Sequence, residues 1–162
     1  MLKDKIKADF KEAFKAKEQL KLSVLKMVNS EIGNAEINKR AKLMKEGGNA
    51  ESVEALAVLN DEEVLQVVSR EVKKRKDSIE AFEGAGRSEL AEKEKEELAV
   101  LMSYMPEQLS EVVIRDLVKK AIEQSGAKGE KEIGKAMAIL SSQVKGKADG
   151  ALVNRIVREL LG

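Results

Sequence analysis

Residues 134–150 read Gly-Lys-Ala-Met-Ala-Ile-Leu-Ser-Ser-Gln-Val-Lys-Gly-Lys-Ala-Asp-Gly, and this stretch organises the C-terminal part of the chain. Apolar residues from Ile133 to Leu140 follow the three-and-four spacing of an amphipathic helix. The Lys145-Gly146-Lys147 segment then forms a turn, and Asp149 is placed to cap a last helix that ends near Leu161. The stretch therefore predicts two short helices joined by a tight basic turn.

The segment before this stretch predicts a third short helix. Ser110 is a suitable N-cap, apolar residues recur from Val113 to Ile122, and Gly126 ends the pattern. Three short helices with tight links can bury one another's apolar faces. Pro106 disfavours helix at the residue before it, so we expect a boundary there, with an N-terminal helical subdomain over 1–105 and a compact three-helix subdomain over 106–162.

The N-terminal part predicts longer helices. Apolar periodicity supports helices over about 2–17, 19–45, 61–82 and from Ser88 to near Tyr104. Asn60 and Glu63 have the spacing of a capping box at the start of the third. Residues 47–52 read as a break, and 53–59 are too short to assign. No useful strand-like alternation occurs, so the predicted fold class is all-α.

Composition excludes several kinds of chemistry. The chain has 162 residues and contains neither Cys nor His, so disulfides, thiolate nucleophiles, imidazole bases and Cys/His zinc sites are excluded. We expect no metal and no cofactor. Net charge is +1, so only local clustering of charge can point to nucleic acid. With no long apolar run and no apolar signal segment near Met1, we expect a cytoplasmic protein without a membrane partner.

One basic cluster lies on the predicted helix over 61–82. Five of the seven residues from Arg70 to Lys76 are basic: Arg70, Lys73, Lys74, Arg75 and Lys76. Such residues can contact phosphates, although a solvated face with pairing to Glu71, Asp77 and Glu80 is the more ordinary interpretation. No aromatic residue is interleaved, so stacking on bases is not expected.

The second basic cluster surrounds the Lys145-Gly146-Lys147 turn. Between Lys128 and Arg158 seven basic residues stand against three acidic ones. The turn lacks the spacing of a Walker loop, so nucleotide hydrolysis is not supported. Gly146 permits close approach of a ligand, and the turn leads into a helix N-terminus whose amides could bind phosphate. A solvated turn between two core helices is an equal alternative from these residues alone.

Two other groups of residues favour structural roles. Glu89 to Glu97 could be paired carboxylates, but the interspersed Lys93 and Lys95 are typical of a surface helix. Ser141 and Ser142 have no obvious base nearby in sequence, and the spacing does not specify a serine–lysine pair.

Several blocks of the chain together resemble the YqeY-like proteins of bacteria, in the order that the family has them. These blocks are residues 22–28 (Leu-Ser-Val-Leu-Lys-Met-Val), 70–82 (Arg-Glu-Val-Lys-Lys-Arg-Lys-Asp-Ser-Ile-Glu-Ala-Phe), 104–110 (Tyr-Met-Pro-Glu-Gln-Leu-Ser), 133–137 (Ile-Gly-Lys-Ala-Met) and 145–150 (Lys-Gly-Lys-Ala-Asp-Gly). Family members often have Leu where this chain has Met105, and the region from Gly47 to Leu59 is longer than the family leads us to expect.

The resemblance implies an all-helical fold in two parts. It also implies kinship with the C-terminal tail of the B subunit of glutamyl/aspartyl-tRNA amidotransferases, carbon–nitrogen ligases that use glutamine as amide donor. In that enzyme the tail contacts the outer corner of the tRNA and catalysis occurs elsewhere. A chain of 162 residues has no room for the catalytic parts of that enzyme, so the resemblance implies a tail standing alone.

The resulting hypothesis is a tRNA-binding helical module without a catalytic site, acting with tRNA or an aminoacyl-tRNA/amidotransferase complex. The predicted contact residues are Gly134, Lys135, Lys145, Gly146, Lys147, Arg155 and Arg158, and Arg70, Lys73, Lys74, Arg75 and Lys76 are candidates to extend the surface. The alternative is a protein-interaction adaptor that docks a partner subunit through its charged helices. A third, weaker alternative is an enzyme of the amidotransferase type.

Overall fold

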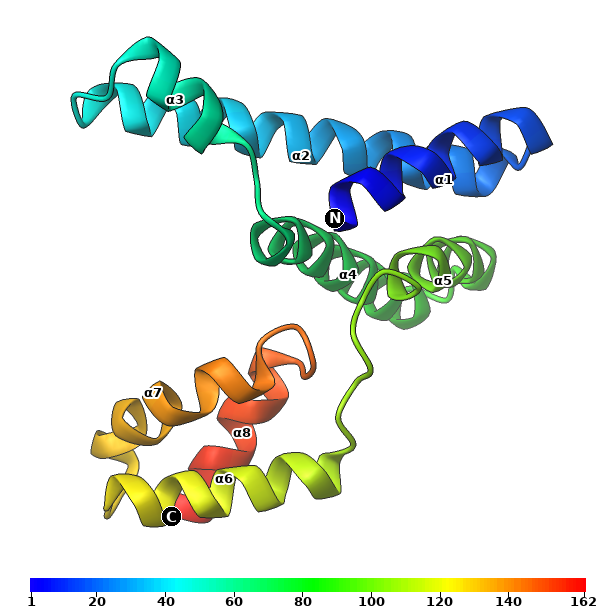
Figure 1. The fold of residues 1–162 in the computed structure, drawn as a ribbon. Coiled ribbons are helices and arrows are strands. Elements are labelled where there is room, and N and C mark those ends of the chain that lie inside the picture. The colour runs from blue at the N-terminus through cyan, green and yellow to red at the C-terminus, as the bar shows by residue number, and fades with distance from the viewer. The chain divides into compact units, whose positions relative to one another are not determined.

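The computed structural model describes all 162 residues, and every regular element is helical (Figure 1). The elements are α1 (Leu2–Ala16), α2 (Gln19–Lys45), α3 (Ala50–Ala57), α4 (Asp61–Gly84), α5 (Ser88–Met102), α6 (Glu111–Ser125), the 3-10 helix η1 (Glu130–Glu132), α7 (Ile133–Val144) and α8 (Gly150–Leu161). The all-α prediction is confirmed. None of the helices is long and apolar enough to cross a membrane. Two compact units, Met1–Tyr104 and Met105–Gly162, make up the chain.

The first unit is built on the long helix α2. Figure 1 shows α1 lying along one half of α2 and α3 folding back along the other half, while α4 and α5 form an antiparallel pair. Residues spaced along one face of α2 are almost fully buried, among them Leu25, Val28 and Ile32. Burial of such a side chain contributes about 1.5–3 kcal/mol, so this face is the main source of cohesion in the unit.

Helix α3 begins at Ala50, so the latter half of the break that the sequence predicted over 47–52 is helical. The Asn49 side chain accepts a hydrogen bond from the Ser52 amide at 2.9 Å and so caps the helix at its first turn. Val53 and Ala57 are buried and hold α3 against α2. A Cβ atom on Gly48 would lie 2.5 Å from Val53 Cγ2, so the approach of the loop to α3 requires glycine.

Helix α4 starts at the predicted capping box. Asn60 accepts from the Glu63 amide, and the Glu63 carboxylate accepts from the Asn60 amide, each at 2.9 Å. Lys39 on α2 also donates to Glu63 at 2.8 Å. At the end of the unit, the buried Tyr104 donates to Asp9 at 2.6 Å, and burial followed by the Asp9 contact raises the pKa of its hydroxyl.

The second unit is a three-helix assembly of α6, α7 and α8. Nine residues form its core, with three from each helix: Ile114, Val118, Ala121, Ala136, Leu140, Val144, Val153, Ile156 and Val157. Ser110 caps α6 through the Val113 amide, and Gly126 ends it in the left-handed conformation at φ 66°. These caps fall where the sequence predicts them. The core packs α6, α7 and α8 together, and the turn over residues 145–149 joins α7 to α8.

Candidate nucleic-acid interface

The α7–α8 turn is a compact backbone structure. Lys147 and Ala148 donate their amides to the Val144 carbonyl at 2.9 and 3.0 Å, and Gly146 has a φ of 72°. That conformation costs a residue with a Cβ atom about 1–2 kcal/mol, so glycine at this position has a conformational reason. The turn presents Lys145 and Lys147, whose side chains are both exposed.

Gln108 and Leu109, which lie just before α6, donate hydrogen bonds to backbone carbonyls of this turn. The Leu109 amide donates to the Lys147 carbonyl at 2.7 Å. The Gln108 side-chain amide donates to the Gly146 carbonyl at 2.9 Å and to the Pro106 carbonyl at 2.8 Å. Two segments about 38 residues apart in sequence are therefore fastened together.

These hydrogen bonds of Gln108 and Leu109 to the turn, called the clamp below, were not predicted from the sequence. Gln108 and Leu109 stand in one of the blocks that resemble the family, but the sequence assigned them no role. The available signal is an amide side chain, that of Gln108, two residues after Pro106 in a segment with no helical periodicity. The partner of this side chain is the backbone carbonyl of Gly146, and every residue has such a carbonyl, so the residue pattern does not indicate the contact.

The N-terminus of α8 is occupied by its own cap. The Asp149 carboxylate accepts from the amides of Ala151 at 2.8 Å and Leu152 at 3.3 Å. The cap itself confirms the prediction for Asp149. The expectation that this helix end offers free amides to phosphate is wrong, because the carboxylate uses two of them and places a negative charge there.

The other predicted contact residues of this unit are exposed, and several are neutralised. Lys135 donates to Glu132 at 2.5 Å. That hydrogen bond, followed by one from the Lys128 amide, holds the pKa of the Glu132 carboxyl below its ordinary value. Gly134 has open space where a Cβ atom would lie, so packing does not require glycine there.

The two arginines of α8 lie in a surface network of ion pairs. Arg155 is 3.7 Å from Glu159 and 4.0 Å from Glu111, and Arg158 is 4.0 Å from Glu130. Exposed pairs of this kind contribute about 0–1 kcal/mol, so a phosphate could replace the carboxylate at small cost. The α7–α8 turn and these arginines share one unit, whereas the α4 cluster belongs to the other.

The basic cluster on α4 divides into structural and exposed residues. Arg75 is 17% exposed and lies 3.0 Å from Glu97 and 3.5 Å from Glu94 on α5. Lys74 donates to the buried Glu71 at 2.5 Å, and this contact raises the pKa of the lysine. Lys73 and Lys76 are exposed. Arg75 thus joins α4 to α5 and is not placed to meet a ligand.

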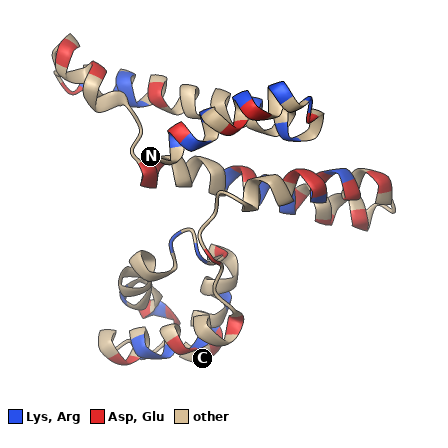
Figure 2. Cartoon of the chain, turned by 45° about the vertical axis from the view of Figure 1, so that its right-hand side comes forward, with Lys and Arg blue, Asp and Glu red and all other residues tan.

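Acidic side chains on α5 also serve packing. Besides holding Arg75, the helix forms surface pairs, such as Lys95 with Glu83 and with Glu92, both at 2.8 Å. No three acidic side chains converge in a way that could hold a metal ion. Figure 2 shows both signs of charge interspersed along the helices, in agreement with the near-zero net charge.

Residues 3–161 match the family of YqeY-like proteins. The chain belongs to the YqeY-like family. This match covers nearly the whole chain, including both units and the turn with its clamp, so the resemblance seen in the sequence blocks is confirmed.

Curated relatives of this YqeY-like chain are fungal. It is 30% identical over 161 residues to altered inheritance of mitochondria protein 41 of Pyrenophora tritici-repentis, covering 98% of this chain and 80% of the relative. The protein of the same name from Candida glabrata is 32% identical over 118 residues, covering 73% of this chain and 57% of the relative. An uncharacterized protein of Schizosaccharomyces pombe is 42% identical over 55 residues, which are 34% of this chain and 45% of that one.

The comparison overturns the expected cytoplasmic location. Both proteins numbered 41 are named as mitochondrial. The expectation rested on the absence of a long apolar run and of an apolar signal segment near Met1. Neither property distinguishes one aqueous compartment from another, because the first concerns only membrane-spanning helices and the second only secretory signal peptides.

Proposed function

We propose that this YqeY-like chain is an RNA-binding module that contacts the phosphate backbone of tRNA and has no catalytic site of its own. The observation that carries the proposal is the α7–α8 turn. It exposes Lys145 and Lys147 on a backbone that Gln108 and Leu109 hold in place. A fixed pair of cations on a glycine turn suits an anionic backbone of regular geometry.

The mechanism is recognition of shape and charge. Double-stranded RNA hides its base edges in a deep major groove, so proteins contact its phosphates and 2′-hydroxyls. The exposed lysines approach the phosphates, and Gly146 lets the backbone come close without a side chain between them. Arg155 and Arg158 of α8 enlarge the basic surface by exchanging their carboxylate partners for phosphate.

The link to tRNA-dependent amidation rests on the family resemblance to the tail of the amidotransferase B subunit. The chain would act in trans, presenting or retaining an aminoacyl-tRNA for an enzyme that supplies the catalytic groups. Its lack of histidine and cysteine supports a module that has neither imidazole nor thiolate catalysis. Amide formation by the isolated chain with glutamine, ATP and mischarged tRNA would overturn this part of the proposal.

The contact residues can be tested with charge-reversal variants. We expect the double variant Lys145→Glu/Lys147→Glu to abolish retention of tRNA in a low-salt gel shift. The single variant Lys147→Glu should weaken retention to a lesser degree. Each lost phosphate contact lowers the slope of log affinity against log salt by about one. The matched control is Lys119→Glu with Lys120→Glu, an exposed pair on α6 with the same change of charge.

Two results would contradict the assignment. Unchanged tRNA retention in the turn variant would show that the turn is not the contact site. Equal affinity for tRNA, duplex DNA and heparin would show that binding is unspecific attraction of charge rather than recognition of RNA shape.

A specific observation also supports the adaptor alternative. Val112 and Val113 at the start of α6 are 71% and 42% exposed, although both are apolar. Exposed apolar side chains among charged ones are typical of protein-docking surfaces. Partners that remain bound in a pull-down after nuclease treatment, and are lost in Val112→Asp, would favour the adaptor; partners lost on nuclease treatment would favour the RNA-binding module.

A further inference from the structure

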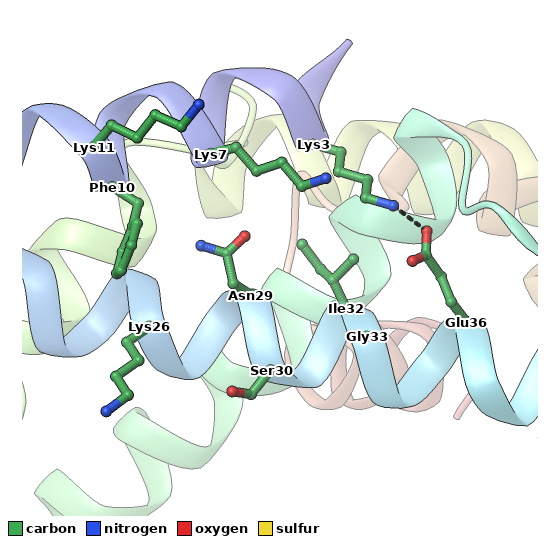
Figure 3. A pocket seen from close by; sticks show the side chains of 10 residues that line it. All are labelled: Lys3, Lys7, Phe10, Lys11, Lys26, Asn29, Ser30, Ile32, Gly33 and Glu36. Carbon is green, nitrogen blue, oxygen red and sulfur yellow. Dashed lines mark hydrogen bonds and ion pairs between the residues drawn. The ribbon is translucent and has the colours of Figure 1, made fainter.

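A groove of about 520 Å³ runs between α1 and α2 in the first unit. Its lining includes four lysines and a single carboxylate, that of Glu36. Figure 3 shows Lys3, Lys7 and Lys11 spaced along α1, while the side chains of Lys26 and Ser30 leave α2 on the side away from α1. Because the whole chain is almost neutral, this concentration of positive charge is a local feature of the groove.

Only one of the four lysines is neutralised inside the groove. Lys3 forms an ion pair with Glu36, drawn as the dashed line in Figure 3. Burial opposes ionisation of Glu36. However, hydrogen bonds from Lys3 and the Leu59 amide and the charges of Lys3 and Lys7 outweigh it, so the pKa of this carboxyl lies below its ordinary value. Glu36 is therefore ionised and forms its ion pair with Lys3, so no carboxylate that lines the groove forms an ion pair with Lys7, Lys11 or Lys26.

The floor of the groove contains a glycine that packing does not explain. Gly33 lies in the middle of α2 with helical backbone, where glycine costs about 1 kcal/mol relative to alanine. A Cβ atom built on Gly33 would meet nothing within 4 Å. No neighbour excludes a side chain at this position, and the glycine keeps the floor of the groove open.

The remaining lining suits more than a bare anion. Phe10 lies between the two helices in Figure 3, and its ring gives the groove an aromatic wall. The Asn29 side chain donates to the Leu25 carbonyl at 2.9 Å, which leaves its own oxygen able to accept a hydrogen bond. The volume falls within the range of small-molecule sites, well above that of a single phosphate ion.

We propose that the α1–α2 groove binds a nucleotide, with Lys7 and Lys11 of α1 at its phosphate and Phe10 beside its base. Phosphate oxygens attract ammonium groups, and aromatic rings stack on bases of any sequence. The nucleotide is either free or one unit of a single RNA strand, and both sources offer the same phosphate and base. The groove shares no residue with the α7–α8 turn, so this inference stands apart from the proposed tRNA contact.

Calorimetric titration of the full chain at low salt tests the groove. The probes are ADP, inorganic pyrophosphate and a single-stranded RNA of about eight nucleotides. We expect ADP or the RNA to bind more tightly than pyrophosphate, since only they carry a base. The variant Lys7→Gln/Lys11→Gln should weaken binding of the tighter probe about tenfold or more.

Two further variants separate binding from folding. Lys15→Gln/Lys93→Gln removes the same charge from exposed positions outside the groove and should keep the affinity of the unaltered chain. Gly33→Met fills the floor with a good helix former, so it should abolish binding while helicity measured by circular dichroism is unchanged. Lys147→Glu should leave ADP binding unchanged, which distinguishes the groove from the tRNA contact.

Three outcomes would overturn the assignment. In the first, none of the three probes binds. In the second, pyrophosphate binds as tightly as ADP and the RNA, and in the third, the groove variant and its charge-matched control lose the same affinity for the probe. Tighter binding of ADP would identify a free nucleotide as the ligand, and tighter binding of the RNA would identify a unit of a strand; both support the groove.

Discussion

Arg75 on α4 and Lys147 after α7 both stand in strongly basic segments, but their surroundings differ. Arg75 is 17% exposed and lies between two carboxylates of α5, whereas Lys147 is exposed on a turn whose carbonyls are held by Gln108 and Leu109. Around Arg75 the backbone is a regular helix, and the Arg75 side chain makes the contact that joins α4 to α5. Around Lys147, hydrogen bonds to backbone carbonyls hold the turn, and the Lys147 side chain is exposed. Local density of positive charge therefore does not identify a ligand surface.

The largest expected effect comes from removing the cation between α4 and α5. Arg75→Met should lower the free energy of unfolding by about 2–3 kcal/mol, because Glu94 and Glu97 then lie partly buried without a counter-charge. Urea denaturation measures the loss. Lys73→Met, an exposed neighbour, should cost under about 0.5 kcal/mol. Equal losses in the two variants would remove the distinction between structural and exposed cations on α4.

The conformation of the turn gives the next effect. Gly146→Ala should lower the free energy of unfolding by about 1–2 kcal/mol, since alanine disfavours a φ of 72°. Gly134→Ala is the matched control, because Gly134 has helical backbone and open space for a Cβ atom, and it should be neutral or stabilising. Thermal unfolding monitored by circular dichroism compares them. A stable Gly146→Ala variant would show that the turn has another accessible conformation.

Loss of the clamp tests whether the turn must be rigid to bind. Gln108→Ala should cost about 1 kcal/mol of stability through the lost hydrogen bond to Gly146. It should also weaken tRNA retention in a gel shift, although no charge changes. Gln124→Ala, an exposed glutamine on α6, serves as control. Stability lowered with tRNA retention intact would mean that the lysines bind without a fixed backbone.

The smallest effect is a dependence of stability on acid pH in the first unit. Hydrogen bonds from Lys39 and from the Asn60 amide hold the pKa of Glu63 below the ordinary 4.5, and the pKa of Glu36 is also depressed. Their contribution is therefore fully present above that value and is lost as pH falls through the folded pKa. Glu63→Gln should lower the free energy of unfolding at neutral pH by about 1 kcal/mol or less. It should also make that free energy fall less steeply between pH 6 and pH 3, which urea titrations at each pH measure. The same dependence on pH in the variant and in the unaltered chain would contradict the assigned cause.

Helix positions were predictable where periodicity and caps coincide. Asn60 with Glu63, Ser110 and Asp149 all cap the helices that their spacing indicated, because a cap is a local interaction over two or three residues. Helix α3 was missed because it has only eight residues, too few for a clear apolar period.

The candidate sites depended more on distant contacts. The exposed lysines of the turn could be named from sequence, but their clamp joins Gln108 to a backbone carbonyl at Gly146. The α1–α2 groove combines Lys7 and Lys11 with Lys26, Asn29 and Gly33 across two helices, and no single helix pattern predicts it. Arg75 looked like its basic neighbours because its carboxylate partners lie on another helix.

By itself, the sequence determined the helical class, most helix ends, the family and the exclusion of histidine and cysteine chemistry. These depend on residue identity and on interactions within a few positions of the chain. Only the tertiary structure decided which cations are paired, which amides are occupied and where α1 and α2 enclose a groove. Those properties arise when side chains far apart in sequence meet, and the energy of a charge depends on its partner and burial rather than on its sequence neighbours.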